Sequence, residues 1–573
     1  MTDLLPQATS AWPSSFTAGL HAALRRRIPP QTDAPELEAL SRDLVLALEQ
    51  GELTVALTPE RLAVAQASGW LEGDASPLLR QGDRIGWRRW LQAMEQVVDA
   101  LVERAHAPVP KPGHAAAPEL SNRLNAEQCV AVRALDQASV VLLSGGPGTG
   151  KTSTVVEVLA RAEARHPGLR IGLAAPTGKA ARRLGEAVLA QRAPLPCSTL
   201  HRWLEAGSRG FGRHRQRPLD LDLLVIDEMS MLDLALTQAL LEALPSGCRL
   251  LLVGDPAQLP PVGSGAVWHR LQQPDVRARF GAGAVHLERT YRNRGALAKV
   301  AQKLRKGDLQ AFAADLAALP EQANLQVHPS PLRRFPALVR ERWMQRLQQL
   351  QELAVDLDRC ADQELMAESR PLFALLEQDL LLCPRRRGPW SLDDVHRTLL
   401  GANAAAKVER WPIGLPVICG SNQPELGLAN GDLGVVIGAG AERRLLFQVV
   451  DPEGQLEVRR LHPARLRRLE PAVALTIHRA QGSEAERVIV LWPDPLEDGP
   501  SAEHQRRLHP ARLRRLEPAV ALTIHRAQGS EADRVIVLWP DPLEDGLAAE
   551  HQRRLLYTAI TRARASLDLV TLI

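Results

Sequence analysis

A glycine-rich segment at residues 145–152 has the residue types that bind a polyphosphate chain. It lies between an apolar run at 140–143 and a helix-like stretch at 155–160, and it consists of Gly145, Gly146, Pro147, Gly148, Thr149, Gly150, Lys151 and Thr152. In this G-x-x-x-x-G-K-T pattern, glycines let backbone N–H groups turn toward phosphates, the lysine adds positive charge, and the threonine hydroxyl can ligate Mg²⁺. The segment therefore predicts a nucleoside triphosphate site with Thr152 as a magnesium ligand.

A second apolar run, residues 223–226, ends in the acid pair Asp227 and Glu228. In a parallel sheet the carboxyl end of a strand faces the phosphate loop, so Asp227 can hold Mg²⁺ while Glu228 polarises the attacking water. Acids are also common near helix starts, so the pair could instead cap a helix near Ser230. Its place after an apolar strand and downstream of a phosphate loop favours triphosphate hydrolysis.

Composition sets the outer limits of the interpretation. The 573 residues are 45% hydrophobic and 24% charged, as in ordinary globular proteins, and no apolar run is long enough to predict a membrane span. The N-terminus lacks the pattern of a signal peptide, so we expect a cytoplasmic protein. Six scattered cysteines without a C-x-x-C pair indicate reduced thiols. A net charge of +4 permits a nucleic-acid partner without requiring one.

The elements that position these residues alternate in type along the chain. Apolar strands are expected at 140–143, 171–175, 223–226 and 249–253, with helical stretches between them. This alternation predicts an α/β fold with a doubly wound parallel sheet. A Pro/Ala-rich linker at 107–118 separates this region from a helix-rich N-terminal part, and short apolar runs with turn signals at 412–460 predict a small β module.

Further motifs follow the expected strand ends in a fixed order. They are APTGKAA at 175–181, STLH at 198–201, GDPAQLPPV at 254–262, LERTYR at 287–292, TIHRAQGSE at 523–531 and YTAITRAR at 557–564. From residue 124 onward this series resembles the superfamily 1 helicases. Within them, 175–181, 427–434 and 557–564 resemble the RecD family, the alpha subunits of exodeoxyribonuclease V.

The resemblance implies two RecA-like P-loop motor lobes, a helical N-terminal domain and a small β module inserted in the second lobe. The expected bounds are a partner-docking N-terminal domain at 1–115, a first lobe at 116–290, a second lobe at 291–400 and 470–573, and the β module at 401–469. A basic loop at about 203–220 carries Arg209, Arg213, His214, Arg215 and Arg217. It is either a DNA contact or a solvated surface loop.

Site roles also follow from the resemblance. Gln128 would read the adenine, Gln258 would sense the γ-phosphate, and Arg292 and Arg562 would reach that phosphate from the second lobe. With Lys151, Asp227 and Glu228 these last three residues complete the expected catalytic set, and Glu484 and Glu531 would also bind nucleotide. The expected DNA-contacting residues are Thr177, His201, Thr523 and His525, with Thr476 and His478 as the equivalents of the last two.

The implied activity is that of an ATP- and Mg²⁺-dependent 5′-to-3′ DNA helicase and translocase. It would act on single strands and duplex ends as part of a heterotrimer with RecB-like and RecC-like subunits, in double-strand break repair and recombination, and without a membrane partner. A free-standing RecD-like helicase remains an alternative, although those relatives carry a longer N-terminal extension. A motor-defective DNA-binding or scaffold subunit is the other alternative.

The second alternative arises from an internal duplication. Residues 459–508 and 506–555 repeat the same text at an offset of 47 with three substitutions, so the units 459–505 and 506–552 each carry the TIHRAQGSE motif. A parallel sheet with one slot for this strand predicts that one copy is extruded, most easily at the turn-rich loop 493–500. Which copy occupies the site is open.

Overall fold

The computed structural model describes most of the chain between residues 14 and 571. The described residues are 14–49, 51–109, 120–122, 124–207, 210–261, 263–291, 296–306, 311, 314–315, 325–329, 335, 337–383, 391–421, 423–428, 431–450, 456–476, 487–490, 532–539, 553–554, 556–558 and 563–571. Within these residues no helix combines the length and the apolar character needed to cross a membrane.

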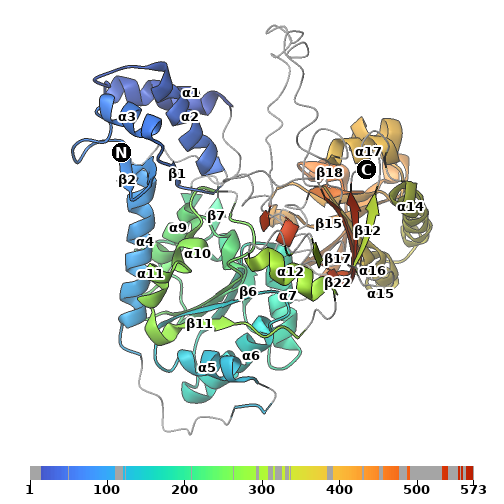
Figure 1. Cartoon of the computed structure of the whole chain (residues 1–573). Helices are drawn as coiled ribbons and strands as arrows, with labels where there is room; N and C mark the ends of the chain where they lie inside the picture. The colour runs from blue at the N-terminus through green and yellow to red at the C-terminus, as the bar shows by residue number, and fades with distance from the viewer. Residues whose placement is uncertain are drawn as a thin grey trace.

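The N-terminal region is mainly helical, as expected, and also contains a small antiparallel sheet in the order β1-β3-β2. Its elements are α1 (Ser14–Arg27), α2 (Pro35–Glu49), β1 (Thr54–Ala56), α3 (Pro59–Ala67), β2 (Leu78–Gln81), β3 (Arg84–Trp87) and α4 (Arg88–His106). In Figure 1 the long helix α4 runs from this region down the side of the first lobe.

A six-stranded parallel sheet in the order β11-β4-β10-β9-β5-β6 forms the first lobe. Its strands are β4 (Val140–Gly145), β5 (Ile171–Ala175), β6 (Cys197–Thr199), β9 (Leu223–Ile226), β10 (Arg249–Gly254) and β11 (Ala284–Leu287). The four strands expected from the sequence are therefore confirmed. The main helices are α5 (Ala126–Ala134), α6 (Lys151–Arg165), α7 (Gly178–Leu189), α8 (Leu200–Trp203), α9 (Leu234–Ala243), α10 (Val267–Leu271) and α11 (Pro274–Ala278).

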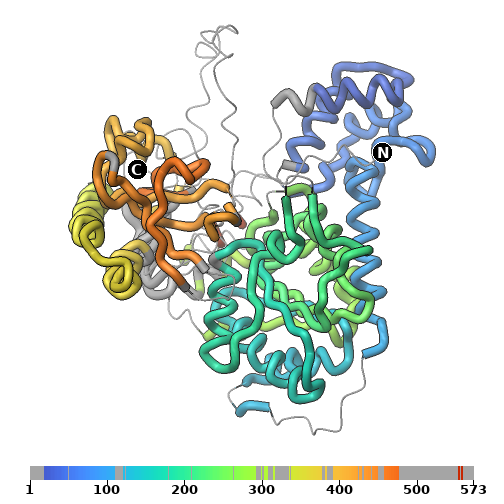
Figure 2. The backbone as a smooth tube through the Cα atoms, turned by 180° about the vertical axis from the view of Figure 1, so that it is seen from behind, coloured from blue at the N-terminus to red at the C-terminus, as the bar shows by residue number. Residues whose placement is uncertain are grey.

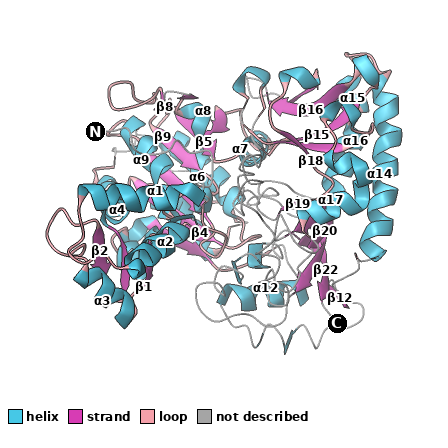
Figure 3. Ribbon diagram, turned by 90° about the horizontal axis from the view of Figure 1, so that it is seen from above, coloured by secondary structure: helices cyan, strands magenta, loops and turns pink. Residues whose placement is uncertain are grey.

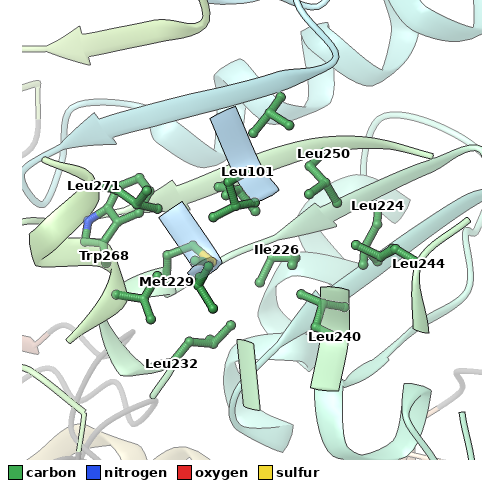
Figure 4. Packing of buried hydrophobic residues seen from close by; sticks show 14 of the residues in the cluster. Leu101, Leu224, Ile226, Met229, Leu232, Leu240, Leu244, Leu250, Trp268 and Leu271 are labelled. Atoms are coloured by element: carbon green, nitrogen blue, oxygen red, sulfur yellow. The ribbon is translucent and has the colours of Figure 1, made fainter. Parts of the chain in front are cut away.

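Both faces of this sheet are covered by apolar side chains, which explains why its strands are continuous apolar runs rather than alternating ones. One face packs against α5, α6 and α7. The other packs against α4, α9 and α10, and Figure 4 shows Leu101 of α4 among Leu224, Ile226 and Leu250 of the sheet. Helix α4 is thus part of the first lobe's core although it precedes the Pro/Ala-rich linker.

A second six-stranded sheet forms the second lobe, in the order β12-β22-β21-β20-β13-β19, with parallel pairing throughout. Its strands are β12 (Leu325–Pro329), β13 (Asp379–Cys383), β19 (Leu475–Thr476), β20 (Arg487–Val490), β21 (Ala532–Trp539) and β22 (Ala563–Thr571). The helices of this part are α12 (Ala296–Lys306), α14 (Ala337–Asp358), α15 (Leu365–Glu368), α16 (Arg370–Gln378) and α17 (Leu392–Leu400). Figure 2 shows the helices of this part, in yellow, beside the first lobe.

Between β13 and β19 in the sequence lies a five-stranded antiparallel sheet in the order β17-β16-β15-β14-β18. Its strands are β14 (Pro416–Cys419), β15 (Leu433–Ile437), β16 (Arg444–Val450), β17 (Leu456–Leu461) and β18 (Leu469–Pro471). Val435, Ile437 and Leu446 of this sheet pack against apolar residues of α14 and α16. Viewed from above, α7 of the first lobe faces this sheet (Figure 3), and Arg182 Nη1 donates to Gln448 Oε1 at 3.2 Å.

The duplicated strand departs from expectation. Both copies lie in the second sheet, because β20 from the first copy pairs with β21 from the second at the repeat offset, with Arg487 opposite Arg534. Ile489 and Ile536, which are equivalent in the two copies, both pair with Asp568 of β22. The expectation that the sheet has one slot and extrudes a copy is therefore wrong for this strand. An apolar parallel strand can be buried on both faces at any central position, so identical copies fit equally well.

Candidate nucleotide site

The phosphate loop connects β4 to α6 at the carboxyl edge of the first sheet. Gly148 and Gly150 adopt left-handed backbone conformations with φ of 70° and 81°. A methyl group added to Gly150 would also lie 2.6 Å from Gln128 Nε2. The backbone angle therefore favours glycine at this position, and a side chain there would also displace the end of the Gln128 side chain.

The loop already forms a network of polar contacts. Lys151 Nζ donates to the carbonyl oxygens of Gly145 and Gly146, each at 3.0 Å, and Thr149 Oγ1 donates to Gly146 O at 2.8 Å. Lys151 is also the first residue of α6, where unpaired N–H groups and the helix dipole favour an anion. Phosphate oxygens entering the loop would thus meet a lysine and a helix N-terminus together.

The acid pair lies at the end of β9. The Asp227 N–H donates to Ala174 O at 2.9 Å, and Asp227 Oδ1 accepts from the Glu228 N–H at 2.8 Å. Desolvation raises the pKa of Asp227, while the positive charge of Lys151 opposes this shift. Glu228 has a φ of 55°, which is a strained backbone conformation for a residue with a side chain.

Helix capping does not explain this pair. The next α-helix, α9, begins at Leu234, and its cap is Asp233, whose Oδ1 accepts from the Leu236 N–H at 2.8 Å. The short 3₁₀ turn after Glu228 has no side-chain capping bond. Both acids instead line the same pocket as the phosphate loop.

That pocket has a volume of about 570 Å³ and brings together most of the predicted nucleotide residues of the first lobe. Those that line it are Pro147, Gly148, Gly150, Lys151, Thr152, Asp227, Glu228 and Gln258. Gln258 is buried, and its Oε1 has no hydrogen-bond partner among the described residues, whereas its Nε2 donates to Asp255 Oδ2 at 3.4 Å. A buried carbonyl oxygen without a partner is costly, so a ligand that supplies a donor would be favoured there.

Thr152 and Asp227 are the pocket residues suited to Mg²⁺. The described part of the chain contains no cluster of three His, Cys, Asp or Glu side chains that would form an all-protein metal cage. Mg²⁺ at phosphate sites is held by one or two protein ligands together with substrate oxygens and water, so one carboxylate and one hydroxyl fit this ion.

Gln128 is 4% exposed and is held by two sets of contacts. Its Oε1 accepts from the Asn125 N–H at 3.0 Å, and its own N–H donates to Asn125 Oδ1 at 2.8 Å, forming a capping box at the start of α5. Its Nε2 donates to Thr149 O at 3.4 Å. The side chain therefore adjoins the phosphate loop, while its role in reading adenine stays a prediction.

The predicted DNA-contacting residues of the first lobe follow neighbouring strands. Thr177 comes after β5 and caps α7, with Oγ1 accepting from the Ala180 N–H at 3.2 Å, and His201 comes after β6 on α8. Thr476 ends β19 and pairs with Cys383 at the carboxyl end of β13. Each of these residues thus lies near the carboxyl edge of a parallel sheet.

Part of the basic loop is neutralised within the chain. Arg213 and Arg217 both pair with Glu205, at 2.8 Å and 2.6 Å, although Arg217 stays exposed like His214 and Arg215, and Arg209 lies outside the described residues. Of the other predicted site residues, seven lie outside the described residues and stay predictions. These are Arg292, Arg562, Glu484, Glu531, His478, Thr523 and His525.

Sequence reasoning missed three residues near the loop. Arg183 of α7 lines the pocket, and a methyl group added to Gly146 would meet Arg305 Nη1 and the Tyr557 hydroxyl, each at 3.3 Å. Arg183 lies two positions after the 175–181 motif, on the helix that the motif starts, so it could have been found by extending the motif. Arg305 is one of three basic residues in the last turn of α12, and nothing in the sequence distinguishes it.

Two known domain families match the chain. The AAA domain matches residues 128–264, which include the phosphate loop and the acid pair. The UvrD-like helicase C-terminal domain matches residues 471–511 and 518–570, which include both copies of the TIHRAQGSE motif.

Among curated proteins, the RecBCD enzyme subunit RecD of Mycolicibacterium smegmatis is 35% identical over 454 residues, covering 73% of this chain and 76% of the relative. The protein of the same name from Mycobacterium tuberculosis is 32% identical over 495 residues, covering 78% of this chain and 81% of the relative. The ATP-dependent RecD2 DNA helicase of Deinococcus radiodurans is 34% identical over 372 residues, covering 63% of this chain and 44% of the relative.

Solved structures give a more distant likeness. The Pif1 helicase from Bacteroides in complex with ADP-AlF3 and ssDNA has a TM-score of 0.39 and 16% identity, covering 79% of this chain and 92% of that one. The Pif1 helicase from Candida albicans has a TM-score of 0.36 and 17% identity, covering 78% and 95%.

Proposed function

This chain belongs to the RecD family of superfamily 1 helicases, and from that premise we propose that it is the ATP-driven 5′-to-3′ DNA motor of a RecBCD-type complex. In this proposal it tracks along single-stranded DNA and unwinds duplex ends during double-strand break repair and recombination. The polarity and the complex follow the family assignment.

The pocket at the phosphate loop carries the proposal. It gathers Lys151, Thr152, Asp227, Glu228 and Gln258, which supply a cation, a hydroxyl, two carboxylates and an amide around one cavity. These are the groups that phosphoryl transfer to water requires. Lys151 binds phosphate oxygens, Glu228 orients the attacking water, and Gln258 contacts the γ-phosphate through its side-chain amide N–H, because phosphate oxygens accept hydrogen bonds.

Mg²⁺, when bound, neutralises charge on the phosphates, and Thr152 and Asp227 would hold it. Arg292 and Arg562 would supply guanidinium groups to the transferring phosphoryl group. Because both arginines would reach the γ-phosphate from the second lobe, hydrolysis would depend on closure of the two lobes.

DNA would run across the carboxyl edges of the two parallel sheets. Thr177 and His201 follow β5 and β6 at this edge of the first lobe, and Thr476 ends β19 in the second. Short polar side chains suit contacts to phosphate and sugar, which hold a strand without reading its sequence. We assign His478, Thr523 and His525 to the same path, and Glu484 and Glu531 to the nucleotide side.

The partners we propose are RecB-like and RecC-like subunits in a heterotrimer located in the cytoplasm. The M. smegmatis and M. tuberculosis relatives, both named as RecBCD enzyme subunits, are covered to 76% and 81% of their lengths. The match to the D. radiodurans RecD2 helicase extends over 63% of this chain, against 73% and 78% for these two relatives, and a free-standing helicase is the alternative. The helical N-terminal region is the part we assign to docking.

A scaffold without motor activity is the remaining alternative, because of the duplication. The first-lobe residues that argue against it, Lys151, Asp227 and Glu228, converge in one pocket. In addition, the Tyr557 hydroxyl, in the segment leading to β22, donates to Asp255 Oδ2 of the first lobe at 3.2 Å, so the two lobes meet despite the duplication.

Unwinding of tailed duplexes tests both parts of the proposal. The purified chain, alone and mixed with RecB-like and RecC-like subunits, is given ATP and duplexes with a 5′ or a 3′ single-stranded tail. We expect unwinding from the 5′ tail only, and co-elution of the three subunits in size-exclusion chromatography. Unwinding from the 3′ tail would contradict the polarity. Full unwinding activity without any association would favour the free-standing alternative.

A further inference from the structure

Helix α12 directs one arginine onto the first lobe. Arg305 Nη2 donates to His286 Nε2 at 2.7 Å, and His286 lies on β11, which pairs with β4 so that His286 is opposite Ser144. The other terminal nitrogen, Nη1, lies over the phosphate loop, where a methyl group on Gly146 would meet it at 3.3 Å. Arg305 does not belong to any of the sequence motifs described above.

His286 connects Arg305 to β4, the strand that leads into the phosphate loop. Since Nε2 accepts from Arg305, the neutral ring carries its proton on Nδ1, and Nδ1 donates to Ser144 Oγ at 2.8 Å. Ser144 Oγ also accepts from Arg277 Nη1 at 3.2 Å and donates to Val285 O at 3.1 Å. Ser144 is fully buried and directly precedes Gly145. The network is partly buried, and hydrogen bonds that are satisfied in this way make a structure more rigid.

Helix α12 is in turn fastened to the segment that leads into β22. Arg553 Nη1 donates to Leu304 O at 2.6 Å and to Arg305 O at 3.2 Å, which are among the last carbonyls of the helix. Tyr557 of the same segment also lies over Gly146. Two residues far apart in sequence, Arg305 and Tyr557, thus reach the loop from one connected unit.

A purely local role for Arg305 is the competing explanation. Cations in the last turn of a helix interact favourably with its dipole, and Lys303 and Lys306 share that turn. That explanation predicts a change in stability but no effect on the phosphate loop. The hydrogen bond to His286, outside the helix, and the approach to Gly146 distinguish Arg305 from an exposed neighbour such as Lys306.

We propose that Arg305 is a positioning residue that links α12 to the phosphate loop through His286 and Ser144, so that movement of the second lobe changes the loop. The inference rests on the proposed motor function. When DNA binding closes the two lobes, this contact repositions the phosphate loop. Chains of packed, hydrogen-bonded groups can carry energetic coupling between two sites, and the described contacts form one such chain from Arg305 to Ser144.

A double-mutant cycle tests the link. Arg305→Met, His286→Leu and the double variant are compared with Lys306→Met, which removes an exposed cation from the same helical turn. We expect Arg305→Met and His286→Leu each to lower the DNA-stimulated kcat for ATP about tenfold, with KM changed less than threefold, because misplacing a loop impairs the reaction more than binding. The double variant should lose no more than the worse single variant. Arg305→Lys, which keeps a donor, should regain at least part of the rate.

Hydrogen–deuterium exchange provides a readout that needs neither DNA nor activity. Arg305→Met and His286→Leu should increase exchange in the peptide that contains residues 144–150, and Lys306→Met should not. Unchanged exchange there, or losses in kcat that multiply in the double variant, would overturn the proposal. A wild-type chain without DNA-stimulated hydrolysis, both alone and with RecB-like and RecC-like subunits, would instead defeat the proposed function, and the exchange result would still decide whether the link exists.

Discussion

The Tyr557 hydroxyl donates a hydrogen bond to Asp255 Oδ2 at 3.2 Å, joining residues 302 positions apart in the sequence. Tyr557 is 2% exposed, and Asp255 also accepts from the Ala257 N–H at 3.0 Å and from Gln258 Nε2 at 3.4 Å. The segment leading to β22 is thus connected, through one carboxylate, to the residue that we assign to the γ-phosphate. We expect this contact to transmit the state of the nucleotide site to the second lobe.

Replacing Tyr557 with phenylalanine tests this contact, because it removes the hydroxyl and keeps the ring. We expect the DNA-stimulated kcat for ATP to fall about tenfold, since a hydrogen bond to a charged group contributes roughly 1.5–3 kcal/mol. Steady-state kinetics with saturating single-stranded DNA measure it. In a cycle with Asp255→Asn the two losses should not multiply, and an unaltered kcat in Tyr557→Phe would refute the role.

The left-handed backbone of Gly150 makes a second prediction. Gly150→Ala should cost roughly 1–2 kcal/mol from its backbone angle alone, and its methyl group would also collide with Gln128 Nε2. We expect a lower melting temperature and weaker binding of a fluorescent ATP analogue. Gly247→Ala is the control, because no atom lies within 4 Å of its added methyl group, and its stability should change by less than about 0.5 kcal/mol. Equal behaviour of the two variants would contradict this reading of the loop.

His286 predicts a pH dependence. Burial and the charges of Arg305 and Arg277 lower its pKa below the ordinary value near 6.5, while Glu288 and Asp255 act in the opposite direction. The folded state therefore binds this proton less readily than the unfolded state. The resulting stabilisation is present above pH 6.5 and is lost as the pH falls below it. We expect the melting temperature to drop more between pH 7.5 and 5.5 in the wild type than in His286→Leu; equal drops would rule out a contribution from His286.

The paired strands of the duplication make a further prediction. Ile489 and Ile536 both pair with Asp568, so either strand alone can pair with β22. A chain lacking residues 491–537 removes one repeat unit and joins Val490 to Leu538 in register. We expect it to fold with an unchanged melting temperature and DNA-stimulated ATP hydrolysis at least equal to the full chain. A deletion that unfolds the second lobe would show that both copies are needed.

Local patterns were sufficient to predict the first lobe's strands and the phosphate loop, because periodicity and glycine spacing are properties of short segments. The N-x-x-Q pattern at Asn125 and Gln128 is also typical of a capping box, which these residues form, although only adenine binding was predicted for Gln128. Contacts such as Arg305 with His286, by contrast, depend on how distant segments pack. The side-by-side strands of the duplication were missed for another reason: the number of slots in a sheet is set by packing and is not encoded in the strand.

Single-strand-stimulated ATP hydrolysis by the purified chain, compared with Lys151→Gln, tests the central claim most directly. Lys151 is the cation of the phosphate loop, and its replacement by a neutral side chain of similar length should leave the loop folded. We expect strong stimulation by single-stranded DNA in the wild type and loss of hydrolysis in Lys151→Gln. Hydrolysis that DNA does not stimulate even when RecB-like and RecC-like partners are present, or that survives in Lys151→Gln, would contradict it.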